Sequence, residues 1–468
     1  MHYEQFSDGN VKCIEDEIPF DLPDGWAWCR LGELFNVCSA KRILKSEWKA
    51  EGIPFYRARE IVKLAEVGSV DNELYISKEH YERLKCEYGV PQPGDLMISG
   101  VGTIGKVYIV SNADCFYYKD ASVLCFENRS GIVIPEFAKY LLESDFLQSQ
   151  MKANSKGTTV DTITISTALN YICILPPPSE QKHIVCAIAN TLSYVKKVQD
   201  NKTQLFNVIA QTKSKILDLA IRGKLVPQDP NDEPASVLLE RIRTEKEKLI
   251  EQGKIKRNKR ESVIFRGEDN SYYQIDNEST SNIDDDLPFD IPNSWCWGRL
   301  KDIVIINPRN KIDDDIEVSF IPMSLINDGY SGSHTMEVSK WKNIKTGFTH
   351  FMEGDIAVAK ITPCFENRKS AILKNLCNGY GAGTTELHIL RPYKGTVLPQ
   401  YLLAFVKSEH FIENGKQTFS GAVGQQRISK EYVENSYFPI PPIEEQNRIV
   451  HQISTIFELL NLITDVLL

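Results

Sequence analysis

The chain has 468 residues, of which 42% are hydrophobic and 25% are charged, and its formal net charge at pH 7 is −9. A chain of this length and composition can bury two cores of ordinary domain size, which excludes a wholly disordered protein. No apolar run approaches the roughly 18 residues of a membrane span, and the acidic N-terminus lacks the features of a signal peptide, so we expect a cytosolic protein.

Two long blocks of the sequence occur twice, in the same order. Residues 19–31 return as residues 288–300, with the pattern Leu/Ile-Pro-x-x-Trp-x-Trp-x-Arg-Leu kept, and residues 175–185 return as residues 440–450. The copies lie much farther apart than the about 20 to 50 residues of solenoid repeats, so each copy is a whole domain with a connector. A chain duplicated in this way presents two similar surfaces.

The chain begins with residues 1–17, which we interpret as a linker-like segment because they match a later polar stretch. The aligned pairs are Tyr3 with Tyr272, Gln5 with Gln274, and Asp16 with Asp285. Residues 18–178 follow as the first globular domain. It is expected to be mixed, since residues 101–110 and 121–126 have strand patterns and residues 135–151 have a helical one.

Residues 179–252 are expected to form a central helical spacer. From Glu180 to Arg222 there is no proline, and apolar residues recur seven positions apart, which predicts a long helix with a coiled-coil seam. A glycine and three prolines then predict a turn, and residues 235–252 predict a second, charged helix. The polar residues 253–286 are expected to be a mobile linker.

The second globular domain is expected over residues 287–442. Residues 355–361 and 386–390 have strand patterns, and residues 399–414 have a helical pattern. In the last segment, residues 443–468, apolar side chains alternate spacings of four and three, which predicts a heptad helix.

The two apolar seams predict that the C-terminal helix packs antiparallel against the central one. The alternative is that each amphipathic helix packs only on its own domain. We therefore expect an α+β fold, with two mixed α/β domains separated by long antiparallel coiled-coil-like helices.

A glycine-rich stretch in the first domain, from Gly100 to Lys106, satisfies G-x-G-x-x-G and nearly satisfies a P-loop, which raises a nucleotide site as one interpretation. A P-loop requires Ser or Thr after the lysine and a following helix, whereas Val107 stands there and begins a strand-like run. We therefore expect a glycine-rich turn between strands. Such a turn can offer backbone N–H groups and Lys106 to a DNA phosphate.

No motif in the chain indicates catalysis. The tripeptide Asn307-Pro308-Arg309 lacks the second proline and the aromatic residue with which an amino-methyltransferase grips a flipped base. The histidines show no metal-ligand spacing, and the 11 cysteines contain no Cys-x-x-Cys pair. We expect no catalytic residue, no metal site and no cofactor in this chain.

The acidic total charge does not exclude DNA, because lysines and arginines gather in clusters in both copies. Polar loop residues are candidates for reading bases, since Gln can pair with adenine and Arg with guanine, although a purely structural loop is the alternative for each. The repeated tryptophans are expected in the cores. The expected DNA contacts are Lys41, Arg42, Arg57, Arg59, Thr103, Lys106, Lys156, Thr158 and Thr159 in the first domain, and Arg309, Lys311, Lys360, Arg368, Lys369, Thr384, Thr385, Gln425, Gln426 and Arg427 in the second.

Taken together, these blocks resemble the specificity subunit of type I restriction-modification systems. The resemblance rests on the repeated tryptophan block, on residues 93–106, on the Pro-Pro-x-x-Glu-Gln exits that end at Gln181 and Gln446, and on residues 220–230. It implies that each globular domain is a target recognition domain that reads one half of a split site in double-stranded DNA. The helices between them would act as a ruler.

The resemblance also implies the partners. Methyltransferase (modification) subunits would dock beside the helices, carry S-adenosylmethionine and flip the target adenine for N6 methylation. Restriction (motor-nuclease) subunits would cut unmodified DNA, with ATP and Mg²⁺. The chain itself would be a non-catalytic DNA-recognition subunit that has no cofactor and no membrane partner.

The second copy departs from the first because it ends at Leu468 and lacks an equivalent of residues 205–260. The second spacer helix is therefore expected to be short. Two other interpretations stay open: a truncated or regulatory specificity chain that acts as a scaffold, and the specificity part of a self-contained restriction-modification enzyme.

Overall fold

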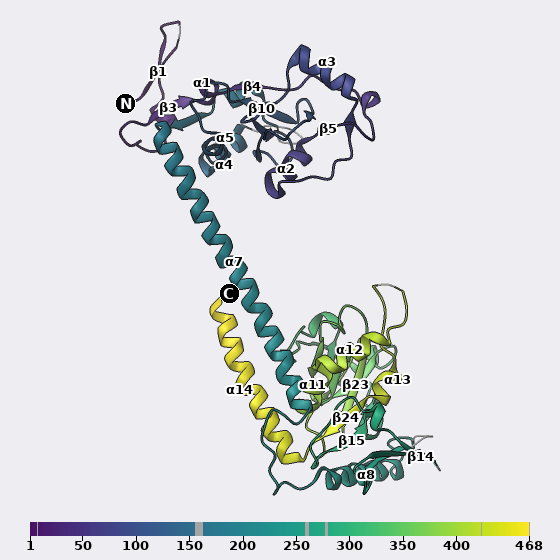
Figure 1. The fold of residues 1–468 in the computed structure, drawn as a ribbon. Coiled ribbons are helices and arrows are strands. Elements are labelled where there is room, and N and C mark those ends of the chain that lie inside the picture. Colours follow the sequence, from purple (N-terminus) through teal and green to yellow (C-terminus); the bar gives the residue numbers. More distant parts are fainter. Residues whose placement is uncertain (7, 155–161, 258–261, 277–278, 423, 468) are drawn as a thin grey trace. The chain divides into compact units, whose positions relative to one another are not determined.

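The structure is a computed structural model that describes residues 1–468 except residues 7, 155–161, 258–261, 277–278, 423 and 468. The chain forms two compact units, Met1–Gln199 and Asp200–Leu468, which are described separately (Figure 1). The boundary between the units falls inside the long helix α7 (Pro178–Ile221).

The first unit is organised around a four-stranded antiparallel sheet. Its strands, in order across the sheet, are β4 (Asn36–Cys38), β10 (Val123–Glu127), β7 (Leu96–Ser99) and β8 (Val107–Ile109). Helices α4 (Pro135–Glu143) and α5 (Asp145–Asn154) cover one face, and α2 (Ala58–Val67) covers the other. Because side chains alternate along a strand, Leu96 and Ile98 pack against α4 and α5, whereas Met97 packs against α2.

Smaller elements complete the first unit. They are the hairpin of β1 (Tyr3–Gln5) and β2 (Val11–Cys13), the pair of β3 (Ala27–Arg30) with β11 (Ile172–Leu175), the strands β6 (Tyr75–Ile76), β5 (Ile53–Tyr56) and β9 (Tyr117–Tyr118), and the helices α1 (Leu31–Leu34), α3 (Lys78–Tyr88) and α6 (Ile165–Leu169). Strand β3 carries part of the tryptophan block and pairs with β11, which leads directly into α7.

The second unit repeats this central sheet. Its strands, in order, are β16 (Val304–Ile306), β23 (Leu387–Pro392), β20 (Ile356–Ala359) and β21 (Ser370–Ile372). Helices α11 (Pro399–Lys407) and α12 (Glu409–Gln417) cover one face. The other face packs against a second sheet, in the order β18 (Glu337–Lys340), β17 (Glu317–Ile321), β22 (Tyr380–Gly383) and β19 (Thr349–Met352). The mixed α/β class expected for the domains is confirmed.

Further elements of the second unit lie outside these two sheets. They are the pair of β15 (Cys296–Arg299) with β24 (Tyr437–Ile440) and the helices α8 (Ala235–Glu251), α9 (Leu300–Ile303), α10 (Trp341–Ile344), α13 (Lys430–Asn435) and α14 (Ile443–Leu467). Strand β24 leads into α14 as β11 leads into α7.

A buried aspartate explains why the Gly-Asp block is repeated. Asp95 and Asp355 are each 1% exposed and stand just before the central strands β7 and β20. Asp355 accepts two hydrogen bonds of 2.8 Å from the guanidinium of Arg391, and Asp95 lies 3.2 Å from Arg129. These carboxylates fix the entry to the sheet, so their role is structural.

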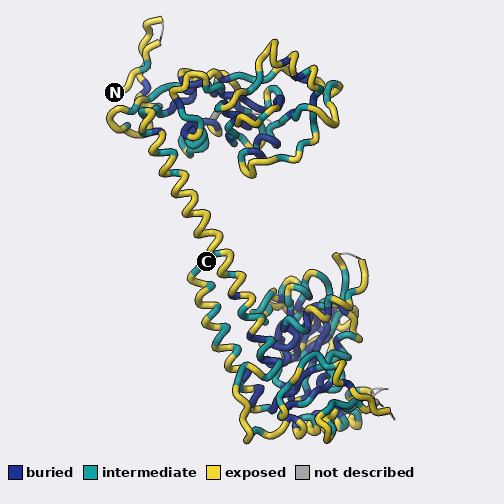
Figure 2. The backbone as a smooth tube through the Cα atoms, viewed as in Figure 1, coloured by how far each residue is buried: buried dark blue, intermediate teal, exposed yellow. Residues whose placement is uncertain are grey.

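Helix α7 has 44 residues and is about 66 Å long at about 1.5 Å per residue. Residues 189–201 are all exposed (Figure 2). In the second unit the last turns of α7 pack antiparallel against α14. The earlier residue Lys213 contacts the later residue Asn461, and the later residue Ile221 shares a core with the earlier residue Ile449. The expected antiparallel pairing is present in this unit, where α14 also packs on its own domain. Within the part of the chain that the structure describes, no helix is long and apolar enough to cross a membrane.

The structure differs from the sequence in the two segments expected to be linkers. The N-terminal one forms the β1–β2 hairpin, and residues after 261 form a three-stranded antiparallel sheet of β12 (Ser262–Arg266), β13 (Tyr272–Asp276) and β14 (Ser279–Asn282). The second of these segments is polar in composition, but a few apolar contacts hold it in place, because Ile264 and Ile283 pack against the buried ring of Trp297. The arginine of each tryptophan block also holds these segments, Arg30 through Glu4 and Arg299 through Gln274.

Two helical segments differ from the sequence in a second way, because each breaks at a serine. The sequence predicts one helix over residues 135–151 and one over 399–414, but Ser144 and Ser408 have extended backbones. Each serine Oγ accepts a hydrogen bond from an N–H of the next helix, as N-cap serines do. The serine cap affects only one turn, and the apolar periodicity continues on both sides of it. The sequence pattern therefore predicts one helix where the structure has two.

Candidate nucleic-acid interface

In the second unit, loop residues gather at the edge of the central sheet where β20 ends and β23 begins. The two strands are antiparallel with Ala359 opposite Leu387, which places Lys360 beside Glu386. The Lys360 N–H donates to the Glu386 carbonyl over 3.0 Å, and the Ile428 N–H donates to the Lys360 carbonyl over 2.9 Å. A third segment, the loop before Ile428, therefore reaches the same edge.

Hydrogen bonds hold this loop against the end of β20. The Thr362 N–H donates to the Gln426 carbonyl over 2.9 Å, and the Gln426 N–H donates to Thr362 Oγ1 over 3.1 Å. The side chain of Gln425 is exposed, and that of Gln426 is half-buried. The structure thus brings six of the expected DNA contacts to one edge: Lys360, Thr384, Thr385, Gln425, Gln426 and Arg427.

Arg427 is fixed by a carboxylate that the sequence did not single out. Its Nε and Nη2 donate to the two carboxylate oxygens of Glu386 over 2.9 Å each, and its Nη1 donates to the Gln425 carbonyl over 2.7 Å. The arginine lowers the pKa of Glu386 below its usual value of 4.5. Because its guanidinium is engaged with Glu386 and with the Gln425 carbonyl, Arg427 also holds the backbone of Gln425 in place, and the Gln425 side chain stays exposed.

A buried histidine lies behind this edge. His388 is 4% exposed, and its Nδ1 is 3.4 Å from Nδ2 of Asn307, a residue in the left-handed region with φ of 52°. Burial lowers the pKa of His388 to about 4, so the ring is neutral at neutral pH. The only signal for it in the sequence is a polar residue inside an apolar strand.

Two other basic residues of the second unit are engaged in the fold. Arg368 pairs with Glu409 and donates its Nε to the Lys407 carbonyl over 3.0 Å. Lys369 lies 3.3 Å from Asp328. Both side chains are only 17% exposed and are held by these partners, although the Ala359 N–H at the end of β20 donates to the Lys369 carbonyl over 3.0 Å.

The expected pair Arg309 and Lys311 follows β16, and both residues are exposed. Arg309 Nη1 donates to the Phe348 carbonyl over 3.3 Å and lies 3.3 Å from His350 Nε2. Its contacts are therefore with β19 and the residue before it, and none is with the loop edge defined by Glu386.

In the first unit the glycine-rich stretch is a turn between β7 and β8, as predicted. Gly102 and Gly105 have φ of 77° and 79°, a region that side chains other than glycine rarely adopt. Thr103 is exposed at the tip of the turn, and Lys106 pairs with Glu66 over 2.8 Å. The turn is not followed by a helix, which removes the nucleotide-loop interpretation.

The same edge exists in the first unit. The Gly100 N–H donates to the Ser122 carbonyl over 2.9 Å, and the Ile163 N–H donates to the Gly100 carbonyl over 3.0 Å. Gly100, Ser122 and Thr162 therefore stand where Lys360, Glu386 and Arg427 stand in the second unit. The expected contacts Lys156, Thr158 and Thr159 precede Thr162 and lie outside the residues that the structure describes.

The other basic residues expected to contact DNA in the first unit have carboxylate or aromatic partners. Arg42 is 73% exposed and its Nε donates to Asp120, two residues before Ser122. Arg57 and Arg59 share Glu60 and Glu73, and the ammonium group of Lys41 lies 5.3 Å from the ring centroid of Tyr88. Of these four, Arg42 is the one that the structure connects to the loop edge.

Comparison with known proteins agrees with the duplicated fold. A family model of the type I restriction modification DNA specificity domain matches residues 23–209 and 292–467. The type I restriction enzyme EcoAI specificity subunit of Escherichia coli is 44% identical over 270 residues, which are 58% of this chain and 43% of that protein. The chain thus spans less than half the length of this curated relative.

Two solved structures share the fold at 17% sequence identity. One is a chain from a study of complex assembly and conformational transition of the type I R-M system, with a TM-score of 0.57 over 96% of this chain and 94% of that one. The other is the HsdS subunit from Thermoanaerobacter tengcongensis, with a TM-score of 0.50 over 96% of this chain and 93% of that one. Since the family model matches both copies of the repeat, the chain belongs to the family of type I restriction-modification DNA specificity domains.

Proposed function

We propose that this chain is the DNA-specificity subunit of a type I restriction-modification complex and that each unit reads one half of a bipartite DNA site. The observation that carries the proposal is the repeated edge. In each unit the end of β7 or β20, the start of β10 or β23 and a third segment, at Ile163 or Ile428, meet through the same two backbone hydrogen bonds. Such an edge offers three backbone segments, with their side chains, to the major groove.

The two edges carry different residues on the same framework. The second unit has Lys360, the Glu386–Arg427 fork and exposed Gln425, whereas the first has Gly100, Ser122 and Thr162 at the matching places. A bidentate amide or guanidinium and a hydroxyl recognise different base edges. The two half-sites are therefore proposed to differ in sequence.

In this proposal α7, which runs from the first unit into the second, is the ruler between the two half-sites. As a ruler, this helix of about 66 Å compares with about 34 Å for one turn of DNA. Methyltransferase subunits dock beside the helices, bring S-adenosylmethionine and methylate adenine at N6. Restriction subunits bring ATP and Mg²⁺. The contribution of this chain is recognition and positioning.

The test is to coexpress the full chain with the methyltransferase subunit of its own system and to map methylated adenines across a genome. A two-part motif with a fixed gap is expected. Replacing the loop of residues 418–427 with that of another family member should change one half of the motif and leave the other half unchanged. A motif that stays unchanged, or methylation without any motif, would refute the assignment of the edges.

A control separates this proposal from the enzyme and scaffold interpretations. The purified chain with S-adenosylmethionine and DNA should transfer no methyl group until the methyltransferase subunit is added. Methylation by the chain alone would indicate a self-contained enzyme. A complex that assembles but shows no sequence preference would indicate a scaffold.

A further inference from the structure

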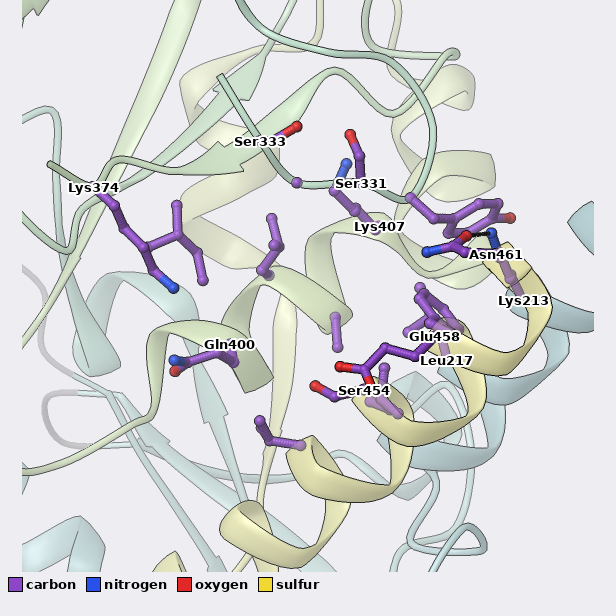
Figure 3. Close-up of a pocket in the computed structure, with 18 of the residues that line it drawn as sticks. Lys213, Leu217, Ser331, Ser333, Lys374, Gln400, Lys407, Ser454, Glu458 and Asn461 are labelled. Carbon is purple, nitrogen blue, oxygen red and sulfur yellow. Dashed lines mark hydrogen bonds between the residues drawn. The ribbon is translucent and has the colours of Figure 1, made fainter. Parts of the chain in front are cut away.

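A pocket of about 660 Å³ opens in the second unit between α11, α14 and the last turns of α7 (Figure 3). This volume is in the range of about 300 to 1,000 Å³ that small-molecule sites occupy. Its floor is apolar, with Leu217 from α7, Leu403 from α11, and Ile453 and Phe457 from α14. Neither of the two loop edges includes these residues.

The rim of the pocket is held in place without a ligand. Gly332 in the rim loop has φ of 64°, which strains other residues, and a Cβ there would lie 2.7 Å from the Leu403 side chain and displace it. Lys407 Nζ donates to the Gly329 carbonyl and, over 2.7 Å, to the Arg368 carbonyl, which fastens the same loop. The Tyr330 ring meets the Phe457 ring edge-on at 5.9 Å. A ligand would therefore enter a pocket that is already formed.

Three lysines line this pocket, and none forms an ion pair with a carboxylate among the residues that the structure describes. Lys407 is 2% exposed and donates to the Gly329 and Arg368 carbonyls. Lys213 donates to Asn461 Oδ1 over 2.6 Å and lies 5.6 Å from the Phe457 ring centroid. Lys374 is exposed at the opposite end of the pocket (Figure 3).

Positive charge in this pocket is poorly compensated. Burial lowers the pKa of Lys407 to about 7, helped by Arg368, and burial also lowers the pKa of Lys213. The carboxylate that lines the pocket is Glu458, whereas Asp328 and Asp465 act on the two lysines from outside it. A cation removed from water is destabilised unless an anion is near, so the pocket favours a negatively charged occupant.

We propose that this pocket binds an organic anion, in which a carboxylate, phosphate or sulfonate group is joined to an apolar body. The anionic group lies at the exposed Lys374, the apolar body lies on the floor between Leu403 and Phe457, and the charges of Lys213 and Lys407 add to the positive potential of the pocket. Such a ligand touches α7, α11 and α14 at once. It therefore stabilises the packing of the helix pair on the domain of the second unit.

The test uses the full chain and 8-anilinonaphthalene-1-sulfonate, an aromatic sulfonate whose fluorescence rises in apolar surroundings. Octanoate and phenyl phosphate should displace this probe and raise the unfolding temperature of the second unit. Inorganic phosphate, which has no apolar body, should do neither. Comparison of octanoate with phenyl phosphate distinguishes a carboxylate ligand from a phosphate ester.

Two variants leave the rim intact, because Lys407 is not changed. Lys374→Gln should weaken binding of all three organic anions about ten-fold, since one charge-assisted contact is lost. Ser454→Trp, at an exposed position of α14, should fill the pocket and abolish displacement. Lys342→Gln is the matched control, because this exposed lysine pairs with Asp315 and does not line the pocket.

Either of two outcomes would overturn the proposal. One is that neither octanoate nor phenyl phosphate displaces the probe at concentrations up to about 10 mM. The other is that Lys374→Gln and Ser454→Trp bind all probes as the unchanged chain does. Neither outcome bears on DNA reading, which is measured separately by the methylation motif.

Discussion

The two units bury the same tryptophan block to different depths. In each, the first tryptophan donates its Nε1–H to a glutamate in the first turn of the following helix, Trp26 to Glu180 and Trp295 to Glu445. Trp295 is nevertheless 3% exposed, whereas Trp26 is only half-buried. Residues repeated in both copies therefore fix the hydrogen bond, and a segment outside the repeated blocks fixes the burial.

The distant element is the segment in which α7 ends and α8 begins. Ile221 and Leu238 share the core of Trp295, and Asp232 pairs with Arg448 of α14 over 2.6 Å. Among the described residues of the first unit no segment plays this part. The side chains of Leu192 and Val195 on α7 are accordingly 53% and 59% exposed.

One feature of the helix start is independent of this cover. Gln181 and Gln446 are both 0% exposed, although the tryptophans near them, Trp26 and Trp295, are buried to different depths. The Oε1 of Gln181 accepts from the Ile134 N–H and that of Gln446 from the Leu398 N–H, each over 2.9 Å. Each glutamine ties its helix to the segment before α4 or α11, so the domain itself holds the helix start.

The largest expected effect comes from truncating the two tryptophans. Trp295→Ala should lower the free energy of unfolding of the second unit by about 3 to 5 kcal/mol, because it leaves a large cavity in a closed core. Trp26→Ala should cost the first unit clearly less, since part of its ring already faces water. Hydrogen exchange measured by mass spectrometry, peptide by peptide, reports the two units separately. Equal losses would break the comparison.

The second prediction concerns acid. His388 and His410, both in the second unit, have pKa values lowered by burial to about 4 from 6.5. A histidine whose pKa is lowered by folding contributes stability that is present above the unfolded value and is lost as the pH falls through the folded value. Between pH 6.5 and about 4 the second unit should therefore lose about 3 kcal/mol for each histidine.

The control for this prediction comes from the first unit, where Leu124 stands at the place of His388. His388→Leu should make the loss of stability between pH 6.5 and about 4 shallower by about half. The measurement is the unfolding free energy from urea titrations at several pH values. An unchanged slope would mean that the buried ring does not resist protonation.

The third prediction concerns reading at the second edge. Gln425→Ala should relax discrimination in one half of the DNA motif by about 1 to 3 kcal/mol and leave the other half as it was. Arg427→Lys should act in the same half, because lysine cannot form the planar fork with Glu386. Competition binding with single-base variants of the site measures both. If the motif is unchanged, these residues are not readers.

The smallest effect is expected at the glycine-rich turn. Lys106→Gln should weaken DNA binding for all sequences alike and reduce the slope of log affinity against log salt by at most about 1. Lys360→Gln should have a larger effect, since Glu66 already neutralises part of the charge of Lys106. Titrations at several salt concentrations test this order. A larger effect of Lys106→Gln than of Lys360→Gln would show that the Lys106–Glu66 ion pair breaks when DNA binds.

Much of the fold follows from signals that lie close together in the sequence. The proline-free seam predicts a helix from 180 to 222, and the structure has it at Pro178–Ile221. The second helix is predicted over 235–252 and found at Ala235–Glu251. Each turn of an amphipathic helix repeats the same evidence, which is why long helices are predicted well.

The candidate site could be predicted only in part. The loop residues of the second edge were predicted as DNA contacts because Gln can pair with adenine and Arg with guanine. Arg368 and Lys369 look the same in the sequence, yet they are held by Glu409 and Asp328. A charge run shows that cations are present, but it does not show which carboxylates neutralise them.

The sequence by itself determined the duplication, the long helices and the glycine-rich turn, because each depends on spacings of a few residues or on a direct match between copies. Only the tertiary structure decided which tryptophan is covered, which arginines are paired and where three lysines face a pocket. Glu386 and Arg427 are 41 residues apart, and Lys213 and Asn461 are 248 apart. Burial and charge compensation depend on such neighbours in space, and residue order alone does not record them.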